Sequence, residues 1–179
     1  MTTPLSLKRV FVANRGEIAV RVLRACRALD LETVIGVSDA DMKSLGAREA
    51  DQAVRLGPAP SKDSYLNADL VIAAAVSSGC DALHPGYGFL SERAGLAELC
   101  DKNGIAFVGP TADTIRRVGD KISARELAQA AEVPLVPGTG EVTSVENAIL
   151  AARDVEYPVV VKASAGGGGR GLELGRWQC

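Results

Sequence analysis

The segment KRVFVANRGEIAVRVLRACRALDLETVIGV, residues 8–37, indicates the fold class, because its pattern predicts a strand, a helix and a second strand in close succession. The apolar, β-branched segments at residues 8–13 and 32–37 are typical of buried strands. Between them, apolar residues recur at the spacing of one helix face and arginines occupy the other side. The apolar stripe comprises Ile18, Ala19, Val22, Leu23, Cys26 and Leu29. Such a unit predicts two parallel strands joined by a right-handed crossover.

The turn that follows the first strand, Asn14-Arg15-Gly16-Glu17, is interpreted as the start of the helix. Asn14 stands at the N-cap position, and Glu17 follows three residues later as its capping-box partner. A dinucleotide-binding turn has three glycines at this place, whereas this turn has only Gly16. We therefore expect the turn to be scaffold and not a coenzyme site.

Strands and helices continue to alternate up to about residue 118. Strands are expected at residues 52–56, 81–84 and 105–108, and helices at residues 47–50, 67–76, 92–103 and 111–118, with Ser91 and Thr111 as N-caps. This alternation predicts an α/β domain with a parallel sheet.

A second unit begins near residue 119. In it, Asp120 caps a helix to residue 131, a strand covers residues 133–136, and Thr143 and Glu146 form a capping box for a helix to about residue 154. About sixty residues are few for closing a core of their own.

The stretch YPVVVKASAGGGGRG, residues 157–171, predicts a phosphate site. A buried strand ends at Lys162, and the glycines that follow allow backbone N–H groups to approach an anion closely. Lys162 and Arg170 add positive charge; the consecutive glycines are Gly166, Gly167, Gly168 and Gly169. The lysine precedes the glycines, so the loop is not a Walker A motif. The alternative is a flexible glycine linker.

A second informative stretch is HPGYGFLSE, residues 84–92. Two glycines around Tyr87 predict a tight loop that presents the ring at the end of a strand, where open α/β sheets bind ligands. The alternative is a structural loop in which Tyr87 and Phe89 pack inward and His84 is satisfied in the core. From spacing alone, both interpretations stay open.

The composition excludes several classes of function. The chain has 179 residues, 47% of them hydrophobic and 23% charged, and a formal charge of −2, so neither nucleic acid nor an anionic membrane is an expected partner. No apolar run is long enough to span a bilayer, and no secretory leader is recognisable. The cysteines, Cys26, Cys80, Cys100 and Cys179, lack C-x-x-C spacing. They predict free thiols in a cytoplasmic protein and no zinc site.

Five blocks together resemble the biotin carboxylase family, in the family's own order. They are the segments at residues 9–30, 57–67, 84–92, 107–125 and 157–171. The resemblance implies a Rossmann-like pre-ATP-grasp domain at residues 1–118, with a parallel sheet and helices on both faces. It further implies the start of an ATP-grasp domain at residues 119–171. The tail LELGRWQC, residues 172–179, matches the family in neither length nor character, and suggests a truncated or frameshifted end.

The resemblance also implies a reaction and its participants. The family uses ATP with Mg²⁺ or Mn²⁺ to activate bicarbonate as carboxyphosphate, and then carboxylates biotin on a biotin carboxyl carrier protein. Lys121 and Lys162 correspond to its two ATP-contacting lysines, the four glycines to its phosphate-covering loop, and Tyr87 to a tyrosine on the biotin side. Family members form homodimers through this N-terminal domain, and arginines on the first helix are candidate contacts.

The resemblance leaves three functions open. Family residues that hold metal, bicarbonate and the biotin ureido group all follow the glycine loop, so no catalytic residue or metal ligand can be named here. The chain would then be the N-terminal part of a biotin carboxylase, inactive alone and weak in ATP binding. Alternatively, it acts by associating with full-length carboxylase subunits. A different ATP-grasp ligase is the third candidate, against which the Tyr87 loop argues.

Overall fold

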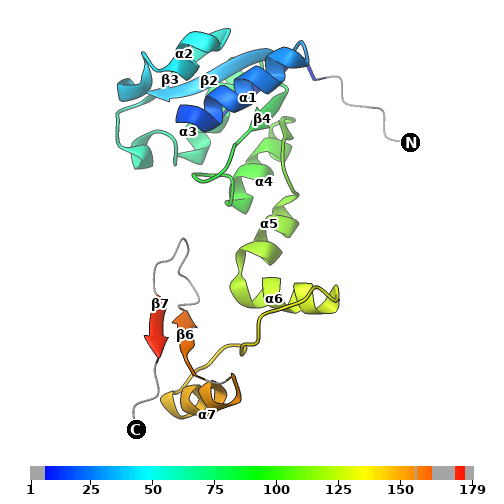
Figure 1. The fold of residues 1–179 in the computed structure, drawn as a ribbon. Helices are drawn as coiled ribbons and strands as arrows, with labels where there is room; N and C mark the ends of the chain where they lie inside the picture. Colours follow the sequence, from blue (N-terminus) through cyan, green and yellow to red (C-terminus); the bar gives the residue numbers. More distant parts are fainter. Residues whose placement is uncertain (1–6, 156, 163–171, 176–179) are drawn as a thin grey trace, which may run out of the picture. The chain divides into compact units, whose positions relative to one another are not determined.

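The computed structural model describes residues 7–155, 157–162 and 172–175, which form two compact units divided between Ile115 and Arg116. Figure 1 draws the helices and strands of both units, coloured along the sequence. The first contains β1 (Arg9–Val12), α1 (Gly16–Ala28), β2 (Glu32–Ser38), α2 (Leu45–Glu49), β3 (Gln52–Gly57), α3 (Ala68–Ser77), β4 (Ala82–His84), α4 (Ala94–Lys102), β5 (Ala106–Phe107) and the start of α5 (Ala112–Gly119). Short 3₁₀ turns follow β2 (Asp39–Asp41) and β3 (Ser61–Asp63).

The sheet of the first unit is parallel throughout, with strand order β3-β2-β1-β4-β5. The predicted parallel α/β domain is therefore confirmed. The chain first moves outward from β1 through β2 to β3 and then returns to build β4 and β5 on the other side of β1. The connection reverses direction between β1 and β4, which makes their carboxyl ends the topological switch point.

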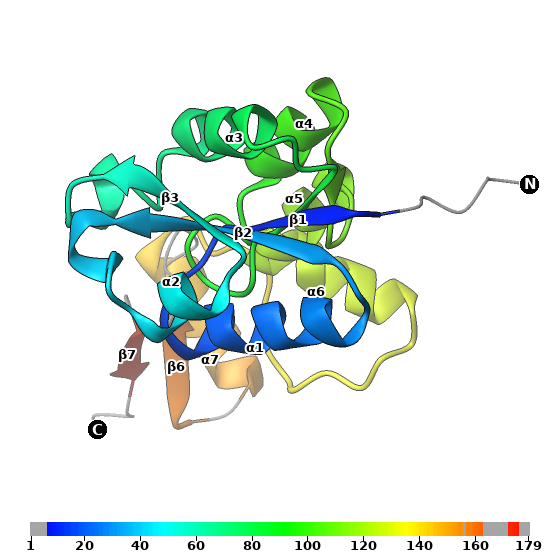
Figure 2. The same cartoon turned by 90° about the horizontal axis from the view of Figure 1, so that it is seen from above.

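Helices cover both faces of this sheet, as expected (Figure 2). Alternate residues of β1, together with Ala13 after it, are buried against opposite faces of the sheet, because successive side chains of a strand point to opposite faces. Val10 and Val12 pack with the buried side of α1, whereas Phe11 and Ala13 belong to the core beneath α3 and α4. Among the helices that the structure describes, none has the length and apolarity needed to cross a membrane.

The predicted N-caps of α1 and α4 are wrong, and so is the assignment of Leu29 to the buried face of α1. The N-cap of α1 is Arg15 and not Asn14, and no side chain caps this helix. The N-cap of α4 is Arg93 and not Ser91. Leu29, assigned to the buried stripe of α1, lies after the last helical residue and is 70% exposed. The cap predictions failed where the polar side chain is engaged elsewhere or lies too early in the chain.

The second unit contains α6 (Lys121–Ala130), α7 (Val145–Val155), β6 (Val159–Lys162) and β7 (Leu172–Gly175). Asp120 caps α6 as predicted, because its carboxylate accepts from the Ser123 amide at 2.8 Å. For α7 the capping residue is Ser144, to which the Asn147 amide donates, and not Thr143. The strand predicted at residues 133–136 is absent from the assigned elements, although these residues are described. β7, which was not predicted, pairs antiparallel with β6.

Candidate functional site

The turn after β1 and the loop after β4 lie side by side at the carboxyl edge of the first unit's sheet. The strands that carry them are neighbours, with Val12 opposite His84. The Ala13 amide extends this pairing by donating to the His84 carbonyl at 3.0 Å. Residues 14–17 and 84–89 therefore meet at the switch point, where open α/β sheets bind ligands.

Asn14 joins the two segments. It is 1% exposed, and its side-chain amide donates to the carbonyl oxygens of Pro85 at 2.8 Å and Tyr87 at 3.0 Å. Its Oδ1 accepts from the Arg15 amide at 2.9 Å. The side chain that was expected to cap α1 is thus committed to the distant loop. The two hydrogen bonds that it donates fix the backbone of residues 85–87, and the one that it accepts ties the loop to the start of α1.

Left-handed backbone gives this loop its shape. Gly86, Gly88 and Phe89 have φ angles of +67°, +69° and +47°. A Cβ on Gly86 would lie 2.6 Å from Ile18 Cγ2 and 2.7 Å from Asn14 Nδ2, so only glycine fits there. Phe89 adopts a conformation that is costly for a bulky residue, which persists only where its surroundings fix it.

Those surroundings are a cluster that we call the Arg15 cluster: Arg15, Asp41, Tyr65 and Phe89. The Tyr65 and Phe89 rings stack with centroids 5.3 Å apart, and the Arg15 guanidinium lies 5.8 Å from each centroid. Asp41 pairs with Arg15 at 3.5 Å and accepts from the Tyr65 hydroxyl at 2.7 Å. The cluster fixes Phe89 by stacking, cation–π attraction and charge.

The electrostatics of this cluster keep Asp41 ionised and Tyr65 protonated. Burial opposes the charge on Asp41, but hydrogen bonds from Tyr65 and Ser38 and the charge of Arg15 leave the pKa of Asp41 below its ordinary value. Burial, with the neighbouring carboxylate, raises the pKa of Tyr65 to about 12. The Arg15 cluster is therefore a fixed structural element at neutral pH.

Tyr87 points outward from the loop and is 60% exposed. Its hydroxyl donates to Glu17 Oε1 at 2.5 Å, and this hydrogen bond raises the pKa of the phenol. Phe89 packs inward, whereas Tyr87 does not. His84 Nδ1 accepts from the Gly86 amide at 3.0 Å, and burial lowers the pKa of the imidazole, so His84 is neutral. The structural interpretation thus holds for His84 and Phe89, and Tyr87 remains available to a ligand.

The predicted ATP residues belong to the second unit. Lys162 is the last residue of β6 and is exposed, opposite Leu172 of β7. Lys121 is the first residue of α6, and its side chain lies outside the described residues. The four glycines are also outside the described residues. Lys162 therefore occupies the strand end that a phosphate loop requires, and the roles of these residues stay predictions.

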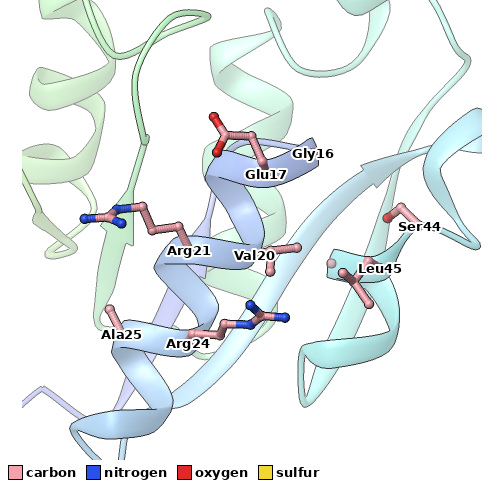
Figure 3. A pocket seen from close by; sticks show the side chains of 9 residues that line it. Gly16, Glu17, Val20, Arg21, Arg24, Ala25, Ser44 and Leu45 are labelled. Atoms are coloured by element: carbon pink, nitrogen blue, oxygen red, sulfur yellow. The ribbon is translucent and has the colours of Figure 1, made fainter.

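A hollow between α1 and α2 is a further feature of the first unit, which the sequence did not indicate (Figure 3). Its described lining combines apolar and basic residues: Gly16, Glu17, Val20, Arg21, Arg24, Ala25, Ser44, Leu45 and Gly46. Arg24 pairs with Glu49 at 2.9 Å, and Leu45 is 47% exposed. In Figure 3 the Arg24 side chain extends from α1 toward α2, whereas Arg21 extends to the other side. Apolar surface beside arginine is typical of protein interfaces.

Comparisons with known proteins relate the sequence of this chain to one family. Residues 6–115 match the family model "Biotin carboxylase, N-terminal domain", and residues 120–178 match "Carbamoyl-phosphate synthase L chain, ATP binding domain". Biotin carboxylase 1 of Bacillus subtilis is 50% identical over 171 residues, which cover 95% of this chain and 38% of that relative. The methylcrotonoyl-CoA carboxylase subunit alpha of rice, Oryza sativa, is 49% identical over 94% of this chain and 23% of the relative.

Solved structures show the same similarity. A biotin carboxylase from Campylobacter jejuni, in a β,γ-ATP complex, superposes with a TM-score of 0.91 at 41% identity, covering 96% of this chain and 39% of that one. The biotin carboxylase domain dimer of Hydrogenobacter thermophilus 2-oxoglutarate carboxylase, with MgADP, ADP and bicarbonate, gives 0.89 at 44% identity and covers 95% and 38%. The chain spans about two-fifths of the length of these structures. It belongs to the biotin carboxylase family.

Proposed function

We propose that this chain is the N-terminal part of an ATP-dependent biotin carboxylase. The observation that carries the proposal is the fixed loop at the switch point, which exposes Tyr87 in a chain of this family. In such an enzyme ATP activates bicarbonate, and the carboxyl group passes to biotin on a carrier protein. Tyr87 would lie on the biotin side, contacting the ligand while Asn14 and the Arg15 cluster hold its loop.

The second unit would supply part of the ATP site. Lys121 and Lys162 would contact ATP phosphates, and Gly166, Gly167, Gly168 and Gly169 would cover them. The exposed position of Lys162 at the end of β6, before those glycines, supports this assignment. Two cations near the phosphates would stabilise their charge by electrostatic attraction. Mg²⁺ is expected with the nucleotide; among the residues that the structure describes, no cluster of three or more His, Cys, Asp or Glu side chains could hold it.

The domain assignment follows from the same proposal. Residues 1–118 would be the pre-ATP-grasp domain, and residues 119–171 the beginning of the ATP-grasp domain. The pairing of β7 with β6 and the family match through residue 178 support joining residues 172–175 to the second domain. Residues assigned by resemblance to metal, bicarbonate and the ureido group would belong to the part of the relatives that this chain does not span.

ATP titration followed by NMR tests the nucleotide site. We expect weak binding, with a Kd above about 1 μM, because much of the family's adenine pocket lies beyond this chain. Replacing a phosphate-contacting lysine removes a charge-assisted hydrogen bond, so Lys162→Met should weaken ATP binding about tenfold or more. Lys43→Met, an exposed lysine of the first unit, is the matched control. Equal affinities of the two variants would reject the assignment of Lys162.

Association with carboxylase subunits is the second candidate function, favoured by the hollow between α1 and α2. A homodimer through this surface would bury Leu45 and the arginines of α1. If the chain pairs with itself, sedimentation equilibrium should detect twice the 18.6 kDa chain mass. If it pairs with full-length subunits, the tagged chain should capture Bacillus subtilis biotin carboxylase in a pull-down. Leu45→Glu in the hollow should abolish either association, whereas Arg48→Glu on exposed α2 surface should not. A monomer that captures nothing would end this candidate.

A further inference from the structure

We propose that Glu17 is a positioning residue for Tyr87: its carboxylate holds the phenol hydroxyl and so sets the direction of the exposed ring. Glu17 lies in the first turn of α1, seventy residues before its partner, and accepts at 2.5 Å. The ligand side of this inference rests on the proposed function of Tyr87. The orientation itself rests only on the geometry of the first unit.

The loop backbone and the ring are held by different residues. Asn14 fixes the carbonyls of Pro85 and Tyr87 and thereby the path of the loop. It does not contact the phenol hydroxyl, and a side chain that is 60% exposed is not fixed by packing. Within the described residues, the Tyr87 hydroxyl has one hydrogen bond, to Glu17. Glu17 therefore supplies the restraint that the backbone contacts leave out.

Glu17 is available for this task because it does not cap its own helix. The N-cap of α1 is Arg15, and no side chain accepts from the first amides. The carboxylate lies in the first turn of α1, at the positive end of the helix dipole, where a negative charge is favoured. A hydrogen bond to a carboxylate is stronger than one between neutral groups. Arg21, one turn later, is the other charged group that acts on the phenol, in the opposite sense.

This arrangement determines how Tyr87 can meet a ligand. Its phenol proton is donated to Glu17, so the hydroxyl is not free to donate to a ligand in the same geometry. The raised pKa keeps that proton in place at neutral pH. Tyr87 would therefore contact its ligand through the ring, held at a fixed angle, and not as an acid or hydrogen-bond donor.

The test is an NMR titration of the 179-residue chain with ¹³Cζ-labelled tyrosine. The chain has three tyrosines, and Tyr87→Phe identifies the resonance of Tyr87. The phenol pKa of Tyr87 should lie above 10 in the wild type, and Glu17→Gln should lower it while keeping an acceptor at the same place. Glu17→Ala should also lower it and broaden or shift the ring resonances.

The matched control is Glu32→Gln, which removes an exposed carboxylate that accepts from Arg9 Nε at 2.7 Å at the start of β2. This variant should leave the Tyr87 resonance and pKa unchanged. An unchanged Tyr87 pKa in both Glu17 variants, with dispersed amide spectra showing that they are folded, would overturn the inference. The ATP titration of Lys162→Met tests the proposed function separately. If Lys162→Met binds ATP as tightly as its control while Glu17→Gln lowers the Tyr87 pKa, the nucleotide assignment fails and the positioning role stands.

Discussion

Asn14→Ala is the perturbation that most directly tests how the loop at residues 84–89 is held. Asn14 is 1% exposed and donates two hydrogen bonds, to Pro85 and Tyr87, besides accepting one from the Arg15 amide. Truncation leaves one buried and one partly buried carbonyl without their donor. An unsatisfied buried group costs about 1–3 kcal/mol, so we expect a loss of about 2–4 kcal/mol in the free energy of unfolding of the first unit.

Hydrogen exchange of amides in β1 and β4 measures this loss, because the slowest amides of a unit report its global opening. Peptides from these strands report the first unit separately from the second. Asn67→Ala is the matched control, since Asn67 is an exposed N-cap that accepts from the Leu70 amide at 3.1 Å. Loss of such a cap costs about 1 kcal/mol. If Asn14→Ala cost no more than Asn67→Ala, the central role assigned to Asn14 would be refuted.

The remaining predictions concern the glycines, the buried thiols and the acid stability of the first unit. Gly86→Ala should lower the melting temperature more than Gly88→Ala. Both glycines have positive φ, but only at Gly86 would an added Cβ lie within 3 Å of other atoms. Equal melting temperatures of the two variants would contradict the predicted clash. In a Cys179→Ser background, Ellman's reagent at pH 8 should label the native chain only slowly. Burial raises the pKa of Cys80 to about 11 and that of Cys100 to about 12, so little thiolate is present. Rapid labelling before unfolding would contradict this prediction. Asp41 has a folded pKa below its ordinary value of 3.8, so it contributes stability above pH 3.8 that is lost as the pH falls toward the folded pKa. Asp41→Asn should reduce the loss of unfolding free energy between pH 5 and 3, measured by urea titration. An unchanged pH dependence would show that other carboxylates cause this loss.

Much of the first unit follows from its sequence because its periodicity is strong. The alternating strand of β1 and the helical spacing of Val22, Leu23 and Cys26 both report burial directly. The parallel order then follows from short β-α-β connections. Local rules failed where a polar residue bonds over a long distance. Asn14 and Glu17 fit a capping box in sequence, yet both side chains contact a loop about seventy residues away.

The candidate site could be predicted only in part for the same reason. The glycines and Tyr87 identified the loop in the sequence. No pattern in the residues before α1 predicted that they hold this loop. Arg15 and Asp41 come from separate turns, so only the fold brings them to Tyr65 and Phe89. In the second unit, the strand expected at residues 133–136 does not form, whereas β7, which was not expected, does form. A strand depends on its partner, and β7 pairs with β6, a partner that periodicity does not identify.

The proposed partial biotin carboxylase is best tested by measuring bicarbonate-dependent phosphate release from ATP in the presence of Mg²⁺ and free biotin. The 179-residue chain would be compared with Bacillus subtilis biotin carboxylase, of which it matches 38%. If the chain is the N-terminal part of such an enzyme, with a Tyr87 loop and two ATP lysines but without the remaining catalytic residues, it should release no phosphate above the protein-free background. Release at a rate comparable to that of the complete enzyme would contradict this account.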